Sequence, residues 1–210
     1  MAVIEKMPEP DAREAEENLR AIRDMMERST KFSTFSGLSG VMAGTASITG
    51  CIVTQSLLQR LAAQSINNRD FKVGFVTVWT MVIIVAIGTD YLLTKRKAAQ
   101  VGKHIVSRLG KQMFVGAAPG LGTGALLTLF LLQHNLVSAI YATWMLCYGC
   151  AVSAVGLFSQ REVLYLGAAF LVAGAVTLSI IPTWGLQMMA VTFGGFHIGY
   201  GLAISRKDGW

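Results

Sequence analysis

Six stretches of this chain are each long and apolar enough to cross a lipid bilayer as one helix. A bilayer core about 30 Å thick needs roughly 20 mostly apolar residues per helix. The strands of a membrane barrel instead alternate over about ten residues, and these stretches do not alternate. The sequence therefore predicts an all-α, polytopic transmembrane helical bundle. Its expected spans are residues 35–58, 73–93, 114–132, 136–157, 163–181 and 186–204.

The composition agrees with a membrane protein and excludes an ordinary soluble domain. The chain is 53% hydrophobic and 14% charged, and its mean hydropathy is +0.51. The exception is residues 1–31, which carry eight acidic and six basic side chains and no apolar run. We therefore expect no cleavable signal peptide, and two parts: a cytoplasmic amphipathic helix within 1–31 and the bundle of 32–210.

Lysines and arginines are concentrated on one side of the predicted bundle. With six spans both termini share a side, and that side also holds the connections after the second and fourth spans. It contains fifteen of the eighteen basic residues, and the other side has only Arg60, Arg69 and Lys72. Because basic residues favour the cytoplasmic side, we expect a multi-pass protein of the bacterial inner membrane with both termini in the cytoplasm.

The N-terminal part has the pattern of one charged helix with a narrow apolar stripe. The helix is expected over 11–27, where Asp11 can cap it and Glu14 follows three residues later. The stripe could pack on the chain's own loops or on the membrane surface, form a dimer seam, or dock a protein partner. The residues proposed for partner binding are Leu19, Ile22 and Met26.

The connection 94–112 is strongly basic and contains no acidic residue. Apolar residues recur along one side of it, so we expect an interfacial helix whose basic face meets anionic lipid headgroups. It has no recognition fold for nucleic acid, which is not expected as a partner. The headgroup-binding residues are Lys95, Arg96, Lys97, Lys103, Arg108 and Lys111.

Glycines at a spacing of four occur in three of the spans. They are Gly40 with Gly44, Gly120 with Gly124, and Gly195 with Gly199. Such GxxxG pairs allow helix backbones to approach closely in a bilayer. We expect them to hold a compact bundle or to form faces for a homo-oligomer.

The three cysteines do not predict a redox or metal site. Cys147 and Cys150 form a CxxC within the fourth span, where a thiolate is disfavoured. With Cys51 they are expected to pack as small apolar side chains. No second pair of ligands accompanies them, so no metal and no cofactor is assigned.

Two ionisable residues, Asp90 and His197, lie inside the apolar stretches. Asp90 is about four residues from the end of its helix, and its ordinary role would be an anchor beside Lys95 and Arg96. His197 is about eight residues from Ser205, or near 12 Å at about 1.5 Å per residue. An imidazole cannot reach the interface over that distance, so His197 should face protein and have a partner.

Hydroxyl groups of the fourth span offer His197 a partner. Tyr148 and Ser153 lie at a similar estimated depth, and Asp90 is somewhat shallower. In the structural interpretation, His197 is neutral and is bonded to a hydroxyl and a backbone carbonyl. The functional ones are a proton-responsive switch, a ligand to a tetrapyrrole, or part of a substrate or quinone pocket. The candidate intramembrane functional residues are His197, Tyr148 and Asp90.

The chain also resembles a family of small six-span membrane proteins of environmental bacteria. The resemblance rests on "NLRAIRDMMERSTKFSTFSGLSGVMAG", "WMLCYGCAVSAVGLFSQREVLYLGAAFLVAGAV" and the closing "FGGFHIGYGLAISRK". Members are often encoded beside a winged-helix transcriptional regulator. The resemblance implies an inner-membrane protein without an assigned activity, and it draws attention to His197, Arg161 and Glu162.

Three functions remain open. The first is a non-enzymatic structural, regulatory or accessory subunit whose cytoplasmic face binds a partner. The second is a small transporter or channel with His197 in its pathway, and the third is a subunit that binds a tetrapyrrole or quinone. A nucleophile with a base and an orienting acid cannot be assembled, because the three histidines lie at three different depths. We therefore do not expect an enzyme.

Overall fold

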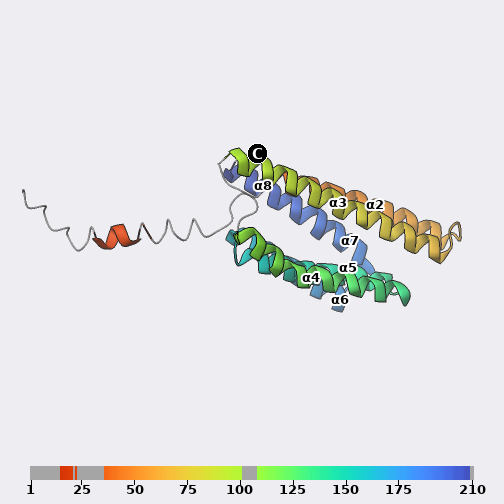
Figure 1. Cartoon of the computed structure of the whole chain (residues 1–210). Helices are drawn as coiled ribbons and strands as arrows, with labels where there is room; N and C mark the ends of the chain where they lie inside the picture. The colour runs from red at the N-terminus through yellow and green to blue at the C-terminus, as the bar shows by residue number, and fades with distance from the viewer. Residues whose placement is uncertain (1–14, 21, 23–35, 101–107, 209–210) are drawn as a thin grey trace, which may run out of the picture. The chain divides into compact units, whose positions relative to one another are not determined.

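The computed structural model describes residues 15–20, 22, 36–100 and 108–208, and these residues are helical apart from short turns. The chain divides into two compact units, Met1–Lys31 and Phe32–Trp210. The larger unit contains six helices long and apolar enough to cross a membrane, which confirms the predicted all-α six-span architecture (Figure 1). The spans are Gly37–Ala62, Asn68–Arg96, Gly110–Gln133, Val137–Gly156, Arg161–Ser179 and Pro182–Arg206.

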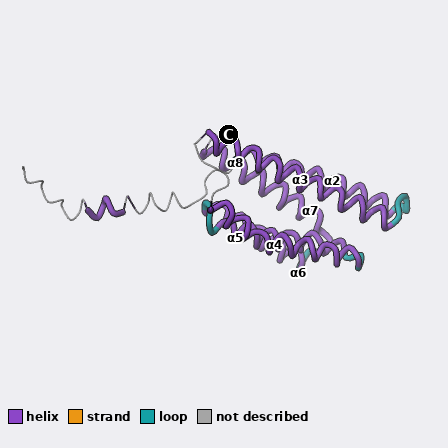
Figure 2. The backbone as a smooth tube through the Cα atoms, in the orientation of Figure 1, coloured by secondary structure: helices purple, strands orange, loops and turns teal. Residues whose placement is uncertain are grey.

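Short turns join α2 to α3, α4 to α5, and α5 to α6 (Figure 2). The last span is assembled from four pieces: a 3-10 turn, a short α-helix, a π-helix and a final α-helix. The elements are α2 Gly37–Ala62, α3 Asn68–Gln100, α4 Arg108–Gln133, α5 Val137–Gly156, α6 Arg161–Ser179, η1 Pro182–Trp184, α7 Gly185–Met189, η2 Ala190–Phe196 and α8 His197–Asp208.

Polar residues build the turns at the end of the bundle where α2 meets α3 and α4 meets α5. Gln64 and Asn135 have φ angles of 56° and 58°, which allows the chain to reverse after each helix. Asn67 caps α3, since its Oδ1 accepts a hydrogen bond of 2.9 Å from the Asp70 backbone N–H. Asn68 Nδ2 donates to Asn135 Oδ1 over 2.8 Å, and this bond joins the two turns.

The helices pack in two groups of three. In one, α2 contacts α3 on one side and η2 and α8 on another; in the other, α5 contacts both α4 and α6 (Figure 1). The short helix α7 and the π-helix η2 touch members of both groups. The final span therefore links α2 to the α4–α5–α6 group.

A continuous hydrophobic core joins the two groups at their junction. Phe75 of α3 meets Tyr141 of α5, with their ring centroids 6.3 Å apart, and Phe71 packs on Phe75. Phe170 of α6 and Met189 of α7 belong to the same cluster. Much of the remaining helix surface is apolar and exposed, as expected for side chains that face lipid.

Glycines permit the closest helix contacts. A Cβ on Gly40 would lie 2.9 Å from the His197 carbonyl oxygen, and one on Gly44 would lie 2.6 Å from the Gly194 carbonyl oxygen, so α2 touches the last span through its backbone. In the other group, a Cβ on Gly120 would lie 2.7 Å from the carbonyl oxygen of Cys147 in α5.

The third glycine pair, Gly195 with Gly199, does not contact another helix of the described chain. A Cβ at Gly195 or Gly199 would meet no heavy atom within 4 Å among the described residues. The glycines of the last span that face α2 are instead Gly194 and Gly201. The predicted packing through Gly195 and Gly199 is therefore wrong for helices within the described chain, because this pair lies on another side of the last span than the glycines that face α2. A homo-oligomer face at this pair stays a prediction.

The basic connection is not one separate interfacial helix in its described parts. Thr94–Gln100 continues α3, and Arg108–Gln112 is the first part of α4. Residues 101–107 lie outside the described residues. Of the predicted N-terminal helix, residues 15–20 and 22 are helical, and the rest of 11–27 is outside the described range.

Candidate functional site

The candidate site lies where α5, α6 and the last span meet. His197 is the first residue of α8, directly after the π-helix η2. Its Nε2 lies 2.7 Å from Tyr148 Oη of α5, which is a full hydrogen bond between two residues that are 49 positions apart. This bond ties the fourth and sixth spans together. Tyr148 is one of the two hydroxyl residues expected at this depth.

Aromatic rings enclose the pair. Tyr148 lies 4.9 Å from both Phe170 and Phe193, centroid to centroid. The imidazole of His197 is nearly parallel to the Phe193 ring and stands at 69° to Phe170. Phe170 is fully buried, and Phe196 packs on it edge to face. The histidine is therefore partly buried among aromatic rings, and the low local dielectric there strengthens its one side-chain hydrogen bond.

The second ring nitrogen faces the backbone of the π-helix. Nδ1 of His197 is buried and lies beside the carbonyl oxygens of Phe193 and Thr192, although neither contact reaches full hydrogen-bond geometry. A π-helix bonds each N–H five residues back and so displaces carbonyls from their α-helical positions. Since carbonyl oxygens only accept, the arrangement favours the tautomer with the proton on Nδ1. Tyr148 then donates its hydroxyl proton to Nε2.

Asp90 occupies a neighbouring position between α3 and α2. Ser39 Oγ lies 2.8 Å from Asp90 Oδ1 and also 2.8 Å from the carbonyl oxygen of Ser36. Gly40, the next residue, touches the backbone of His197. The carboxyl group of Asp90 also lies within electrostatic reach of the Tyr148 hydroxyl. Four helices, α2, α3, α5 and α8, therefore bring their polar residues into one region of the bundle.

The three predicted intramembrane residues thus belong to one neighbourhood, and Ser153 does not. Ser153 faces α6, where a Cβ on Gly167 would collide with its Oγ. Asp90 is not only an anchor at the interface, because its carboxyl group bonds a side chain of another helix. Lys95 lies over the ring of Tyr91, with 6.0 Å from Nζ to the centroid, and no salt bridge between it and Asp90 occurs among the described residues.

The predicted partner-binding and headgroup-binding residues are only partly described. Leu19 and Ile22 are 67% and 48% exposed, so the stripe has no cover among the described residues. Met26 and Lys103 lie outside the described residues. Lys95 and Arg96 are exposed at the end of α3, and Lys111 is exposed in α4. Lys97 and Arg108 belong to the same two helices.

The described residues hold no group of three histidine, cysteine or acidic side chains placed for a metal ion. Cys51 is buried, whereas Cys147 is partly buried and Cys150 exposed, so the expectation of packed cysteines holds fully only for Cys51.

His197 could serve as an axial ligand to a tetrapyrrole only by giving up its bond to Tyr148, because Nε2 already forms that hydrogen bond. A ligand through Nδ1 would have to enter between the ring and the π-helix.

The structure also contains buried polar side-chain atoms that sequence reasoning missed. Thr54 Oγ1, Trp79 Nε1 and Tyr141 Oη are buried without a hydrogen-bond partner. Trp79 and Tyr141 both border the core cluster that holds Cys51, one helical turn before Thr54. Thr54 and Cys51 share a face of α2, and that spacing was the one sequence signal for Thr54.

No protein-family model, curated protein or solved structure matches this chain.

Proposed function

We propose that the protein is an integral protein of the bacterial inner membrane that catalyses no reaction and serves as a structural, regulatory or accessory subunit. Its cytoplasmic face binds a protein partner. The observation that carries this proposal is the apolar stripe of the N-terminal helix, where Leu19 is 67% and Ile22 48% exposed. Large apolar side chains at this spacing on an otherwise charged helix are typical of a helix that docks in a groove.

The chemistry of the helix defines the partner. Glu16 and Glu17 are exposed beside the stripe, and Glu16 is paired with Arg20 over 2.8 Å. A complementary partner would therefore present an apolar groove with a basic rim. Such a groove could belong to a soluble regulator or to a subunit of a larger membrane complex.

Serine at both positions of the stripe should abolish partner binding. Removing two central apolar anchors from a helix-groove interface should weaken it by about tenfold or more. We expect a protein that co-purifies with the full chain from its native membrane to be lost from the Leu19→Ser, Ile22→Ser variant, measured by quantitative mass spectrometry.

The matched control is the Arg13→Ser, Asp24→Ser variant, which makes the same number of serine changes at charged positions off the stripe and leaves the net charge unchanged. It should retain the co-purifying protein. If both variants retain it equally, the stripe does not bind the partner and this function is rejected.

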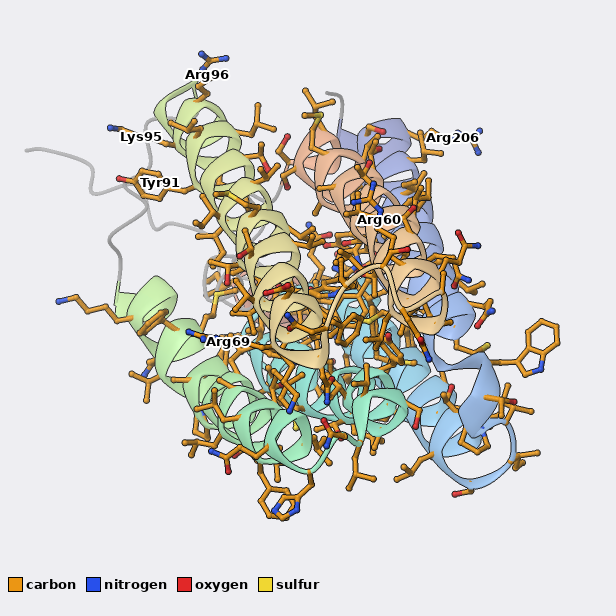
Figure 3. The ribbon with its side chains drawn as sticks, turned by 90° about the vertical axis from the view of Figure 1, so that its right-hand side faces the viewer. Arg60, Arg69, Tyr91, Lys95, Arg96 and Arg206 are labelled. Atoms are coloured by element: carbon orange, nitrogen blue, oxygen red, sulfur yellow. The ribbon has the colours of Figure 1, made fainter. Side chains whose placement is uncertain are left out.

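Charge distribution supports the cytoplasmic placement of both termini. Lys95 and Arg96 stand at the end of α3 and Arg206 near the end of α8, whereas Arg60 and Arg69 flank the α2–α3 turn (Figure 3). Because α2 and α8 are antiparallel, the ends of α3 and α8 lie on the same side. That side is the basic one, and the positive-inside rule assigns it to the cytoplasm.

Cysteine labelling tests the orientation. In a variant without native cysteines, Ser65→Cys in the α2–α3 turn should react in intact cells with a maleimide that cannot cross membranes. Gln160→Cys, which precedes α6, should react only after lysis, since it lies at the opposite end of the helices. The reverse pattern would place the termini outside.

A small transporter or channel with His197 in its pathway is the second candidate. The Tyr148–His197 bond favours it, since an ionisable pair that joins two groups of helices can report or drive their separation. Proteoliposomes with the full chain should then dissipate a pH gradient faster than those with His197→Phe. A purely partner-binding protein should leave the gradient intact in both.

A further inference from the structure

Asp90, Ser39 and Ser36 form a chain of three oxygen atoms. Ser39 Oγ is 2.8 Å from Asp90 Oδ1 and 2.8 Å from the Ser36 carbonyl oxygen. Both distances are those of O–H···O hydrogen bonds. The Ser39 hydroxyl has a single proton and can donate only one of the two bonds, and a carbonyl oxygen never donates.

From this proton count we infer that Asp90 is a proton-binding site of the protein and carries its proton in this conformation. The carboxylic acid donates to Ser39 Oγ, and the Ser39 hydroxyl donates to the Ser36 carbonyl oxygen. With an ionised Asp90, one of the two 2.8 Å contacts would set two lone pairs against each other. The inference does not depend on the proposed partner-binding function.

The surroundings of Asp90 fit a neutral acid. Arg60 is the one charged residue of α2, the helix that packs on α3 here, and it stands at the other end of that helix. From the other elements, the Tyr148 hydroxyl lies within electrostatic reach of the Asp90 carboxyl group. Tyr148 in turn interacts with Tyr200 and is hydrogen-bonded to Nε2 of His197. On α3 itself, Lys95 lies over Tyr91. No cation is thus paired with the carboxyl group among the described residues, and an unpaired carboxylate in a membrane span is costly.

Release of the proton has a defined structural consequence. The Asp90 O–H bond breaks and the proton passes to water at the level of the exposed Lys95, five residues along α3, or about 8 Å at the helical rise of about 1.5 Å per residue. The Ser39 hydroxyl then rotates and donates to the carboxylate. The Ser36 carbonyl oxygen then loses the hydroxyl donor and keeps backbone donors, among them the Ser39 N–H at 3.2 Å. Proton binding therefore favours the tight start of α2 against α3.

Three oxygens at these distances suit a proton better than a metal cation. An alkali cation needs more ligands, and it must sit between oxygens that are farther apart than 2.8 Å. Sodium is nevertheless the alternative occupant that an experiment should separate from the proton. The described residues near Asp90 also hold no set of acidic, histidine and cysteine side chains suited to a divalent metal.

The test is labelling with dicyclohexylcarbodiimide, an apolar reagent that adds to protonated carboxylic acids. The full chain in lipid nanodiscs is treated between pH 6 and pH 9, and the modified residue is identified by peptide mass spectrometry. We expect Asp90 to be labelled near neutral pH, several times faster than Asp70 or Glu162, and the rate to fall as pH rises. Sodium should leave the rate unchanged.

Two variants control the test. Asp90→Asn keeps a donor toward Ser39 and should fold, but it should not be labelled at position 90, and its thermal stability should not change over the pH range. Ser39→Ala should shift the pH profile of Asp90 labelling, whereas Ser47→Ala, a buried serine on the same helix that bonds only the Ala43 carbonyl oxygen, should not. Protection by sodium, or no preference for Asp90 at any pH, would overturn the proton site.

Discussion

The Gly201→Ala substitution is expected to destabilise the bundle more than alanine at any glycine where an added Cβ would meet no atom within 4 Å. A Cβ at this position would collide with the Gly37 carbonyl oxygen and lie 2.8 Å from the Val41 backbone nitrogen. Both atoms belong to the backbone of α2 and cannot move aside without moving the helix. Overpacking of this kind typically costs 1–3 kcal/mol. For a chain of this size we expect a fall in the unfolding temperature of about 5 °C or more.

The measurement is the fraction of detergent-solubilised protein that remains monodisperse on size-exclusion chromatography after heating. Gly199→Ala is the matched control, two residues earlier in the same helix, where a Cβ would meet nothing within 4 Å. It should be neutral or slightly stabilising, because alanine favours a helix by about 1 kcal/mol over glycine. Equal unfolding temperatures for the two variants would contradict the α2–α8 contact.

The six spans could be predicted because the membrane imposes a length and a composition on each of them. The predicted stretches fall within or overlap the six observed helices, and only their ends differ by several residues. Hydropathy does not record which helices are neighbours. The sequence therefore did not reveal that α2 would pack on the last span and α5 between α4 and α6.

The last span shows why a helical wheel fails where the helix is irregular. A constant rotation of about 100° per residue places Gly194, His197 and Gly201 on one stripe. In the structure both glycines face α2, whereas the imidazole meets Tyr148 of α5. The π-helix Ala190–Phe196 has a wider turn and changes the rotation just before the histidine. No pattern in the sequence predicted that turn, and it also supplies the carbonyls beside Nδ1.

Depth was the sequence signal that did locate the site. Counting residues from the helix ends placed Tyr148 and His197 at one level and Asp90 slightly nearer the interface. These depth estimates use only the helical rise per residue, so an error in the rotation of a helix about its axis does not change them. The bond from Ser39 to Asp90 needed the rotation of two helices as well, and it emerged only from the structure.

The substitutions Tyr148→Phe and His197→Phe should show the largest coupling free energy of unfolding between two residues of this protein. Tyr148→Phe leaves Nε2 of a partly buried imidazole without its partner, and His197→Phe leaves a partly buried hydroxyl without one. Each loss typically costs 1–3 kcal/mol. The double variant removes both polar groups and keeps three neighbouring rings to pack against, so it should be at least as stable as either single variant.

The coupling free energy of this double-mutant cycle should therefore be about 1–3 kcal/mol, measured by reversible unfolding in mixed detergent micelles. Tyr165→Phe, at an exposed tyrosine of α6, is the control and should change neither stability nor the effect of His197→Phe. Additive losses in the cycle would mean that the Tyr148–His197 bond is not formed in the membrane. The pair would be assigned to the transport pathway by a different result: the unaltered chain dissipates a pH gradient, whereas the double variant is stable but does not. In that case the fold has survived the loss of both polar groups, so the lost activity is due to the pair itself.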